Sequence, residues 1–345
     1  MGLSKLRIAI IGCGAVAELV HLPALAKIGL RPVLLVDKDL QRAQTLADRF
    51  HVEGVSQDYQ VNMGAFDAAI VAIPHHLHAP VTLYLLAKGV HVLVEKPMAM
   101  TSVEAQDMQA AAKQTDTILA VGMSWHFRRA QMWVKGALEA NLLGNLKSFN
   151  FQEGRVFDWP VISDFTFLKE KGGGVLLDTG SHVLDLLIWW LGEVAEFTYQ
   201  DDSIGGVEAN CEINLTMASG VRGFVALSRT RNLRCTAIIK GTHGEIEVGL
   251  STTRLRANPP NLLDFKAGDL KGNRLGTQAD GNSSELELLD WINSIETGRQ
   301  PSVTGEATAR SITLIENMRN QRRTIAFPWL EMDRAHGLAE PGDKD

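Results

Sequence analysis

One stretch of the chain places a histidine and two carboxylates at helical spacing. Asp178, His182 and Asp185 stand at positions i, i+4 and i+7, so a helix would carry them on one face. The residues around them are mostly valine, leucine and isoleucine, which predicts a buried helix. Burying ionisable groups is costly unless they have partners. The three side chains therefore form either a structural network, in which they hydrogen bond to one another, or an acid–base site. The pattern favours the acid–base site.

A lysine at the end of a predicted strand could take part in such a site. The β-branched run His91–Val94 leads into Glu95, Lys96 and Pro97. A proline restricts the preceding residue to an extended backbone, so Lys96 is expected at the carboxyl end of the strand. An ammonium group held there could stabilise negative charge on a reacting oxygen. A surface turn is the alternative interpretation of this tripeptide taken alone.

The N-terminal segment has the pattern of a dinucleotide-binding turn. An apolar run over residues 8–11 leads into a glycine-rich turn, and Glu18–Ile28 is predicted to be helical. The turn consists of Gly12, Cys13, Gly14, Ala15, Val16 and Ala17. The first glycine permits the tight turn, the second lets the backbone approach a pyrophosphate, and the helix N-terminus offers N–H groups to the phosphates. A turn that only reverses the chain is the alternative.

An acidic residue ends the second predicted strand. Asp37 lies at roughly the 20-residue distance from the glycines that is expected of an acid binding the adenosine ribose. Because its carboxylate would repel a ribose 2′-phosphate, we expect NAD(H) to be the favoured cofactor. The nearby cations Lys38 and Arg42 could contact such a phosphate, so NADP(H) is the alternative.

Three histidines, His75, His76 and His78, follow the third predicted strand. A doubly wound sheet places its ligands at this edge. Adjacent histidines point in different directions and no second cluster completes a coordination set, so no metal site is predicted. A structural or helix-capping role is the alternative to cofactor binding. The residues expected to contact the cofactor here are Pro74, His75, His78, Glu95 and Lys96.

The order of the predicted elements indicates two domains. Residues 1–122 alternate short β-branched runs with helical segments, which predicts an α/β domain with a doubly wound parallel sheet of the Rossmann type. Residues 123–332 are expected to form an α+β domain with an open, mostly antiparallel sheet for substrate binding and oligomerisation, and residues 333–345 a polar tail. Strands are predicted at Arg7–Ile11, Pro32–Asp37, Ala68–Ile73, His91–Val94 and Ile118–Val121, then at Leu146–Gly154, Ala195–Tyr199, Ala209–Met217, Gly220–Ser228, Cys235–Gly241 and Gly244–Val248. Later helices are predicted at Arg129–Ala140, Ser284–Thr297 and Glu306–Arg319.

The composition argues against several classes of partner. The 345 residues carry a formal net charge of −6 with dispersed lysines and arginines, unlike a nucleic-acid-binding protein. The N-terminus has no pattern of a secretion signal, and the apolar stretch Val183–Leu191 is too short to cross a membrane. The three cysteines are widely spaced, which indicates reduced thiols. We therefore expect a cytoplasmic protein without a nucleic-acid or membrane partner.

Taken together, the glycine turn, the Glu-Lys-Pro tripeptide and the glycine-rich segment that leads into the Asp178 helix resemble one family. It is the glucose–fructose oxidoreductase, inositol dehydrogenase and rhizopine-catabolism family, written Gfo/Idh/MocA, and the resemblance covers about residues 6–327. It implies that Lys96, Asp178 and His182 are the catalytic trio of an NAD(P)-dependent oxidoreductase acting on a CH–OH group of a sugar or cyclitol. It also implies a C-terminal sheet that mediates assembly of a homo-oligomer, a dimer or a tetramer.

Two positions depart from the family's pattern. His75 stands where many members have asparagine, and His126-Phe127 stand where many have an arginine–aromatic pair. We expect a small polyhydroxylated substrate to lie against aromatic and charged residues of the second half, although packing and surface charge would explain the same residues. The candidate substrate contacts are Trp125, His126, Arg128, Arg155, Asp158, Trp159, Asp178 and His182, with Asp164 beside them.

In the expected reaction His182 takes or gives the hydroxyl proton, Lys96 stabilises charge on the reacting oxygen, and Asp178 orients the pair. Two other functions stay open because a fold does not determine a function. Some relatives of similar fold use bound NAD in a transient oxidation that assists glycoside cleavage. A non-catalytic dinucleotide-binding protein is less favoured, because the trio would then have no use.

Overall fold

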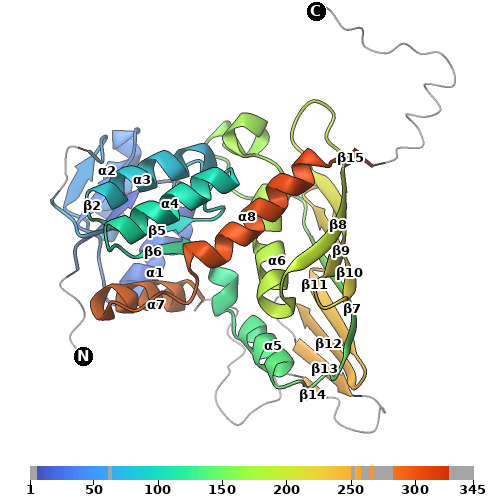
Figure 1. Cartoon of the computed structure of the whole chain (residues 1–345). Helices are drawn as coiled ribbons and strands as arrows, with labels where there is room; N and C mark the ends of the chain where they lie inside the picture. The colour runs from blue at the N-terminus through green and yellow to red at the C-terminus, as the bar shows by residue number, and fades with distance from the viewer. Residues whose placement is uncertain (1–5, 61–63, 250–252, 258–264, 267–282, 326–345) are drawn as a thin grey trace, which may run out of the picture.

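The first of two sheets in the computed structural model has six parallel strands in the order β3-β2-β1-β4-β5-β6 (Figure 1). The structure describes residues 6–60, 64–249, 253–257, 265–266 and 283–325. The strands of the first sheet are β1 (Ile8–Ile11), β2 (Leu34–Val36), β3 (Gly54–Ser56), β4 (Ala68–Val71), β5 (His91–Glu95) and β6 (Leu119–Gly122). Helices α1 (Leu22–Lys27), α2 (Leu40–Phe50), α3 (His78–Ala87) and α4 (Ser102–Gln114) lie between them in the chain.

Both faces of this sheet are buried. Along β1, Ile8 and Ile10 belong to one hydrophobic cluster, whereas Ala9 and Ile11 belong to the cluster on the opposite face. Strands buried on both faces consist of continuous apolar runs, which is why their sequences are recognisable. The predicted doubly wound sheet of the Rossmann type is confirmed.

The second sheet has nine strands in the order β14-β13-β12-β11-β7-β10-β9-β8-β15. Most neighbours are antiparallel, but β10 pairs with β7, and β15 with β8, in parallel. Helices α5 (Arg129–Glu139), α6 (Val175–Leu191) and α8 (Gly305–Asn320) lie on the side of this sheet that faces the first domain (Figure 1). The strands are β7 (Leu146–Gly154), β8 (Val194–Asp201), β9 (Asn210–Met217), β10 (Arg222–Ser228), β11 (Thr236–Gly241), β12 (Gly244–Gly249), β13 (Thr253–Ala257), β14 (Phe265–Lys266) and β15 (Arg323–Thr324).

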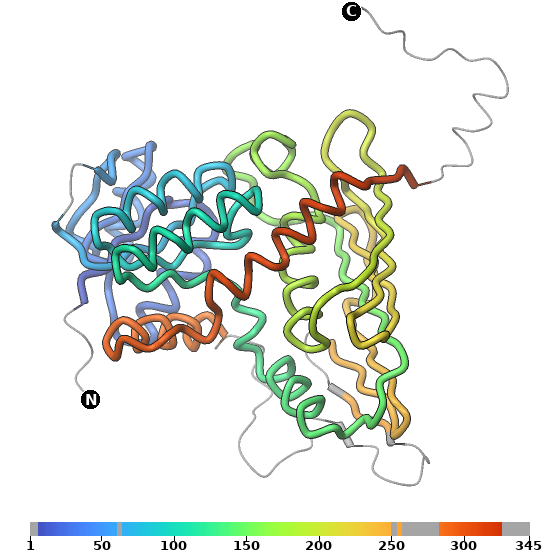
Figure 2. The backbone as a smooth tube through the Cα atoms, viewed as in Figure 1, coloured from blue at the N-terminus to red at the C-terminus, as the bar shows by residue number. Residues whose placement is uncertain are grey.

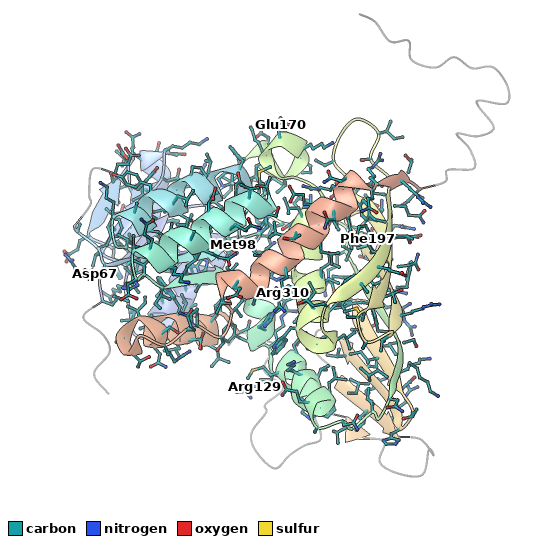
Figure 3. The ribbon with its side chains drawn as sticks, viewed as in Figure 1. Asp67, Met98, Arg129, Glu170, Phe197 and Arg310 are labelled. Atoms are coloured by element: carbon teal, nitrogen blue, oxygen red, sulfur yellow. The ribbon has the colours of Figure 1, made fainter. Side chains whose placement is uncertain are left out.

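Two late helices connect the domains. After strand β14 the chain returns to the first domain, where Leu288 and Trp291 of α7 (Ser283–Thr297) join the same core cluster as Ile8. Helix α8 then runs diagonally back toward the second sheet (Figure 2). Near its start, a Cβ on Gly305 would lie 3.1 Å from Cε of the buried Met98, which Figure 3 labels. The two domains therefore share a packed junction.

Several elements differ from the sequence-based expectations. Strand β3 was not predicted because it is a three-residue, half-buried edge strand whose sequence, Gly54–Ser56, contains no apolar run. The helix predicted at Glu18–Ile28 is divided into a π-helix at Ala17–His21, labelled η1, and helix α1. Pro23 lies in the first turn of α1, where an α-helix tolerates a residue without an N–H group.

In the second domain the predicted strands are confirmed, whereas β13, β14 and β15 were not predicted. The predicted polar tail lies outside the described residues, and the domain boundaries stay predictions. Within the described ranges, no helix combines the length and hydrophobicity that crossing a bilayer requires.

One buried acid makes the stability of the first domain depend on pH. The Glu287 side chain of α7 is buried, and its Oε1 has no hydrogen-bond partner among the described residues. Burial raises the pKa of Glu287 well above its ordinary value, and the charges of Glu95 and Asp290 raise it further. The folded chain therefore keeps this carboxyl group protonated at a pH where the unfolded chain ionises it, which stabilises the unfolded state.

We predict that Glu287→Gln increases the free energy of unfolding, and that the gain grows with pH above about 4.3, the ordinary pKa of glutamate. The growth is at most about 1.4 kcal/mol per pH unit, until the pH reaches the folded-state pKa. Urea unfolding between pH 5 and pH 9 measures it. Glu296→Gln, at an exposed position of the same helix, is the control and should show no such trend. Equal pH dependence in the parent and Glu287→Gln would contradict the prediction.

Candidate active site

The glycine turn lies at the edge of the first sheet where parallel strands place their carboxyl ends. Gly12 has a φ of +98°, and a Cβ there would lie 2.1 Å from the carbonyl oxygen of Ala72, so the position requires glycine. A Cβ on Gly14 would meet no heavy atom within 4 Å. Ala15 and Val16 open the helical segment that follows. Other backbone atoms pack against the turn at Gly12, whereas the space beside Gly14 is free of protein atoms. This arrangement fits the approach of a pyrophosphate to Gly14.

The carboxylate of Asp37 is fixed beside this turn. Its Oδ2 accepts a hydrogen bond from the backbone N–H of Cys13 at 2.8 Å, and its Oδ1 accepts one from Asp39 at 2.9 Å. Lys38 is exposed, and Nη2 of Arg42 lies 3.3 Å from Oδ2 of Asp39. Arg42 therefore has an acidic neighbour of its own, whereas Asp37 occupies the position expected of a ribose-binding acid.

The histidines that follow Pro74 lie in different environments. His75 is buried, and its Nδ1 donates to the carbonyl oxygen of Gly172 at 2.8 Å. Burial lowers the pKa of His75 to about 3, which leaves a neutral ring with Nε2 as an acceptor. His78 is completely buried, with Nδ1 2.8 Å from Pro97 O and Nε2 2.7 Å from Ile73 O. This arrangement favours the structural alternative for His78. Over the ranges that the structure describes, no three His, Cys, Asp or Glu side chains could together hold a metal ion.

Lys96 and Asp178 meet although 82 residues separate them. Nζ of Lys96 donates to Oδ1 of Asp178 and, at 3.2 Å, to its backbone oxygen. Oδ2 of Asp178 accepts from Nη2 of Arg229 at 2.6 Å. Burial by itself would raise the pKa of Asp178, but the charges of Lys96 and Arg229 outweigh it and hold the pKa far below the ordinary value. Asp178 is therefore a carboxylate clamped between two cations.

A second acid supports the backbone of Lys96. Oε2 of Glu95 accepts the Lys96 N–H at 3.1 Å, and Oε1 lies 2.8 Å from Nε2 of the buried His21 in the π-helix η1. Burial opposes ionisation of Glu95, but the hydrogen bond from His21 and the charges of His21, Lys96 and His78 together outweigh it and lower the pKa of Glu95. The end of β5 is thus connected directly to the helical segment after the glycine turn.

Hydrogen bonds from two distant segments, the residues before β9 and helix α8, fix the start of helix α6. Gly174 has a φ of +105°, and a Cβ there would lie 2.2 Å from Oε1 of Glu208. That same oxygen accepts the N–H of Leu176 at 2.9 Å, which satisfies a donor in the first turn. Arg319 of α8 donates to the carbonyl oxygen of Gly173 at 3.1 Å. These contacts fix the turn that carries Asp178.

His182 lies one helical turn beyond Asp178 and is held by stacking. Its ring lies parallel to that of Trp125, at 3° with the ring centroids 4.6 Å apart. The Arg128 guanidinium lies 4.5 Å from the Trp125 centroid. Nδ1 of His182 is buried and has no hydrogen-bond partner among the described residues. Burial, followed by the charges of Lys96 and Arg128, lowers the pKa of His182 well below 6.5, so the ring is neutral near pH 7.

The third member of the predicted polar stripe has a different partner. Oδ2 of Asp185 is bonded to Nε2 of His126, and the His126 ring stacks on Trp189 with centroids 4.3 Å apart. The side chains of His126 and Asp185 are both largely buried. Asp185 thus bonds to a residue outside the predicted stripe and is separate from the Lys96–Asp178 contact.

The remaining candidate substrate contacts lie on a more exposed segment. Arg155, Asp158 and Trp159 are exposed, and Asp164 bonds to Lys171 at 2.8 Å. In the described part of the chain, none of these side chains hydrogen bonds to the predicted catalytic trio. Their role in substrate binding stays a prediction.

Sequence reasoning missed three residues that support the site: Arg229, His21 and Glu208. Arg229 follows β10, and no pattern links it to Asp178. His21 lies in the helix predicted at Glu18–Ile28, where a histidine gives no signal of its partner. Only the tertiary structure brings the three to the site.

Comparison with known proteins defines the family. Residues 6–123 match the profile described as "Oxidoreductase family, NAD-binding Rossmann fold", and residues 132–247 match the Gfo/Idh/MocA C-terminal domain. This chain belongs to the Gfo/Idh/MocA family. The resemblance seen in the sequence is thereby confirmed, together with the NAD-binding character of its first domain.

Among curated relatives, D-glucoside 3-dehydrogenase of Escherichia coli K12 is 32% identical over 192 residues, 55% of each chain. Trans-1,2-dihydrobenzene-1,2-diol dehydrogenase of Mus musculus is 28% identical over 63% of this chain and 66% of its own. The matched part thus spans about half to two thirds of these relatives. The rhizopine catabolism protein MocA of Rhizobium meliloti is 24% identical over 91% of this chain and 94% of its own.

Solved structures share the fold over nearly the whole chain. Levoglucosan dehydrogenase in complex with NADH superposes with a TM-score of 0.81 at 20% identity, covering 92% of this chain and 98% of that one. The WlbA dehydrogenase from Bordetella pertussis, in complex with NADH and UDP-GlcNAcA, gives a TM-score of 0.82 at 19% identity, covering 93% and 96%. At these identities the similarity establishes the two-domain fold.

The two glycines of the turn should respond differently to substitution. We predict that Gly14→Val folds with a melting temperature close to that of the parent but binds NADH at least about tenfold more weakly, because its side chain would enter the open side of the turn. Gly12→Ala should instead lose stability, since its Cβ would overlap the Ala72 carbonyl. Thermal melting and NADH fluorescence titration measure the two effects. NADH affinity unchanged in Gly14→Val would show that the cofactor site is misplaced.

Proposed function

We propose that this chain is an NAD(H)-dependent dehydrogenase or reductase acting on a hydroxyl or keto carbon of a sugar, cyclitol or sugar derivative. The observation that carries the proposal is the contact between Lys96 and Asp178, with His182 one turn further along the same buried helix. The relatives with sugar and diol substrates support the substrate class. The homo-oligomer and the cytoplasmic location expected from the sequence stay predictions.

Each member of the trio has a role that its surroundings support. Lys96 has three N–H donors and gives two contacts to Asp178, which leaves one donor for a reacting oxygen. His182 is neutral and can accept the hydroxyl proton as a general base. Asp178 orients Lys96 and keeps its charge at the site. NAD, when bound, supplies the hydride acceptor, so one C–H and one O–H bond break as the carbonyl forms.

The catalytic roles predict that substitutions in the trio reduce turnover but leave cofactor affinity nearly unchanged. His182→Ala and Lys96→Ala should each reduce kcat by about 10²–10⁴-fold while NADH affinity changes only a few fold, because neither is expected to hold the pyrophosphate. Lys113→Ala, on helix α4, is the surface control. Absorbance of NADH with myo-inositol, methyl β-D-glucopyranoside and UDP-glucose as probes measures turnover.

The same assay tests the pH dependence and the alternative reaction. Since the pKa of His182 lies well below 6.5, kcat/KM for alcohol oxidation should stay level from pH 8 to below pH 6.5 and fall only where the ring is protonated.

Near-normal turnover in both alanine variants would rule out the mechanism. Glycoside cleavage without net NADH formation would favour the NAD-assisted hydrolase instead.

The assignment of Asp37 to the ribose predicts how two substitutions change the ratio of NADPH to NADH affinity. Asp37→Ser should raise the ratio of NADPH to NADH affinity by about tenfold, because it removes the charge that opposes a 2′-phosphate. Asp39→Asn should raise it less, since it retains Asp37 and frees Arg42 from its acidic neighbour. Titration with both reduced cofactors gives the ratios. Tighter binding of NADPH than of NADH by the unmodified protein would contradict the assignment.

A further inference from the structure

A small cavity lies beside Trp125, the residue that stacks on His182. It has room for about one water molecule, so it would admit a single small group rather than a sugar ring. Its lining combines apolar walls with three polar side chains, from Arg128, Gln131 and Glu153. None of these three is needed for the proton and charge transfers assigned to the trio.

Gln131 brings an unused acceptor to this cavity. The residue is only 6% exposed, and its Oε1 is buried without a hydrogen-bond partner among the described residues. Its backbone is fixed, because its carbonyl oxygen accepts from Nε1 of Trp190 at 3.2 Å. A buried acceptor without a donor is unfavourable in the free protein. A ligand that donates a hydrogen bond would remove this cost.

Glu153 supplies a second acceptor and restricts the charge of the ligand. Its side chain is buried near the end of β7, and the thiol of Cys235, which also lines the cavity, donates to the neighbouring backbone oxygen of Gly154 at 3.3 Å. Burial raises the pKa of Glu153, while the charges of Arg155 and Arg128 oppose that rise. An anionic group would be repelled by Glu153 once ionised and an ammonium group by Arg128. A neutral hydroxyl can donate to the two acceptors and accept from a guanidinium.

We propose that this cavity is a subsite for a second, non-reacting hydroxyl of the substrate, with Gln131 and Glu153 as specificity-determining residues. The proposal rests on the proposed function and narrows its substrate class. The substrate carries a neutral hydroxyl or hydroxymethyl group that reaches past the His182–Trp125 stack. A deoxy analogue would leave the Gln131 acceptor buried and unpaired, and the site would discriminate against it.

The test combines variants with substrates that lack one hydroxyl. Gln131→Met keeps the length of the side chain without its acceptor, Glu153→Gln removes the charge, and Gln106→Met at an exposed position of α4 is the matched control. The probes are methyl β-D-glucopyranoside and myo-inositol, each with its monodeoxy analogues. The readouts are kcat/KM and calorimetric binding of the probes to the NADH-loaded protein.

For one particular hydroxyl, its removal should weaken the parent's binding and kcat/KM by about tenfold or more. In Gln131→Met, the same removal should weaken binding and reduce kcat/KM by less than about twofold. Glu153→Gln should also reduce the discrimination between the probe and its deoxy analogue. Gln106→Met should match the parent. The melting temperature of free Gln131→Met should equal or exceed that of the parent, since an unpaired buried acceptor is gone; a purely structural glutamine would give a lower one.

The outcomes separate the two proposals. If the parent binds and oxidises a probe but no hydroxyl shows this coupling to Gln131, the subsite is refuted and the proposed function stands. If the parent neither binds nor turns over any of the probes or the UDP-sugars, the proposed function fails and the subsite fails with it.

Discussion

The arrangement of the molecule depends on one carboxylate. Asp178 is held between Lys96, from the end of the first sheet, and Arg229, from the end of β10 in the second sheet. A partly buried carboxylate with two cationic partners is stable, whereas loss of either partner would leave an unbalanced charge. The three elements that supply these groups must therefore keep their relative positions, and the orientation of the domains is coupled to the chemistry at their junction.

The neighbouring histidines differ in what surrounds them. Burial, followed by the charges of Lys96 and Arg128, lowers the pKa of His182 and disfavours protonation of its ring. Its orientation comes from the flat contact with Trp125 rather than from an acidic partner. His126, the residue that follows Trp125, has an acidic partner instead and bonds directly to Asp185. Both histidines stack on a tryptophan, but only His126 also bonds to a carboxylate.

Much of the fold was predictable from the sequence because the central strands of the first sheet are buried on both faces and leave continuous apolar runs. Edge strands such as β3 leave no such signal. The helical spacing correctly predicted one buried face for Asp178 and His182, but spacing does not reveal partners. Asp185 shares that face and bonds to His126, and Arg229 reaches Asp178 from a position with no recognisable pattern. Tertiary contacts between distant segments decide such pairings.

Helix α7 has a consequence for the synthesis of the chain. Leu288, Trp291 and Ile292 complete the hydrophobic cluster that Ile8 and Ile10 begin. A ribosome makes these residues after strands β7 to β14 of the second sheet, so the N-terminal domain leaves the exit tunnel with one apolar surface uncovered. That surface cannot reach its final packing until residue 292 of the 345 has emerged. The order of translation thereby makes the two domains mature together, and a nascent chain that stalls midway exposes a surface that chaperones recognise.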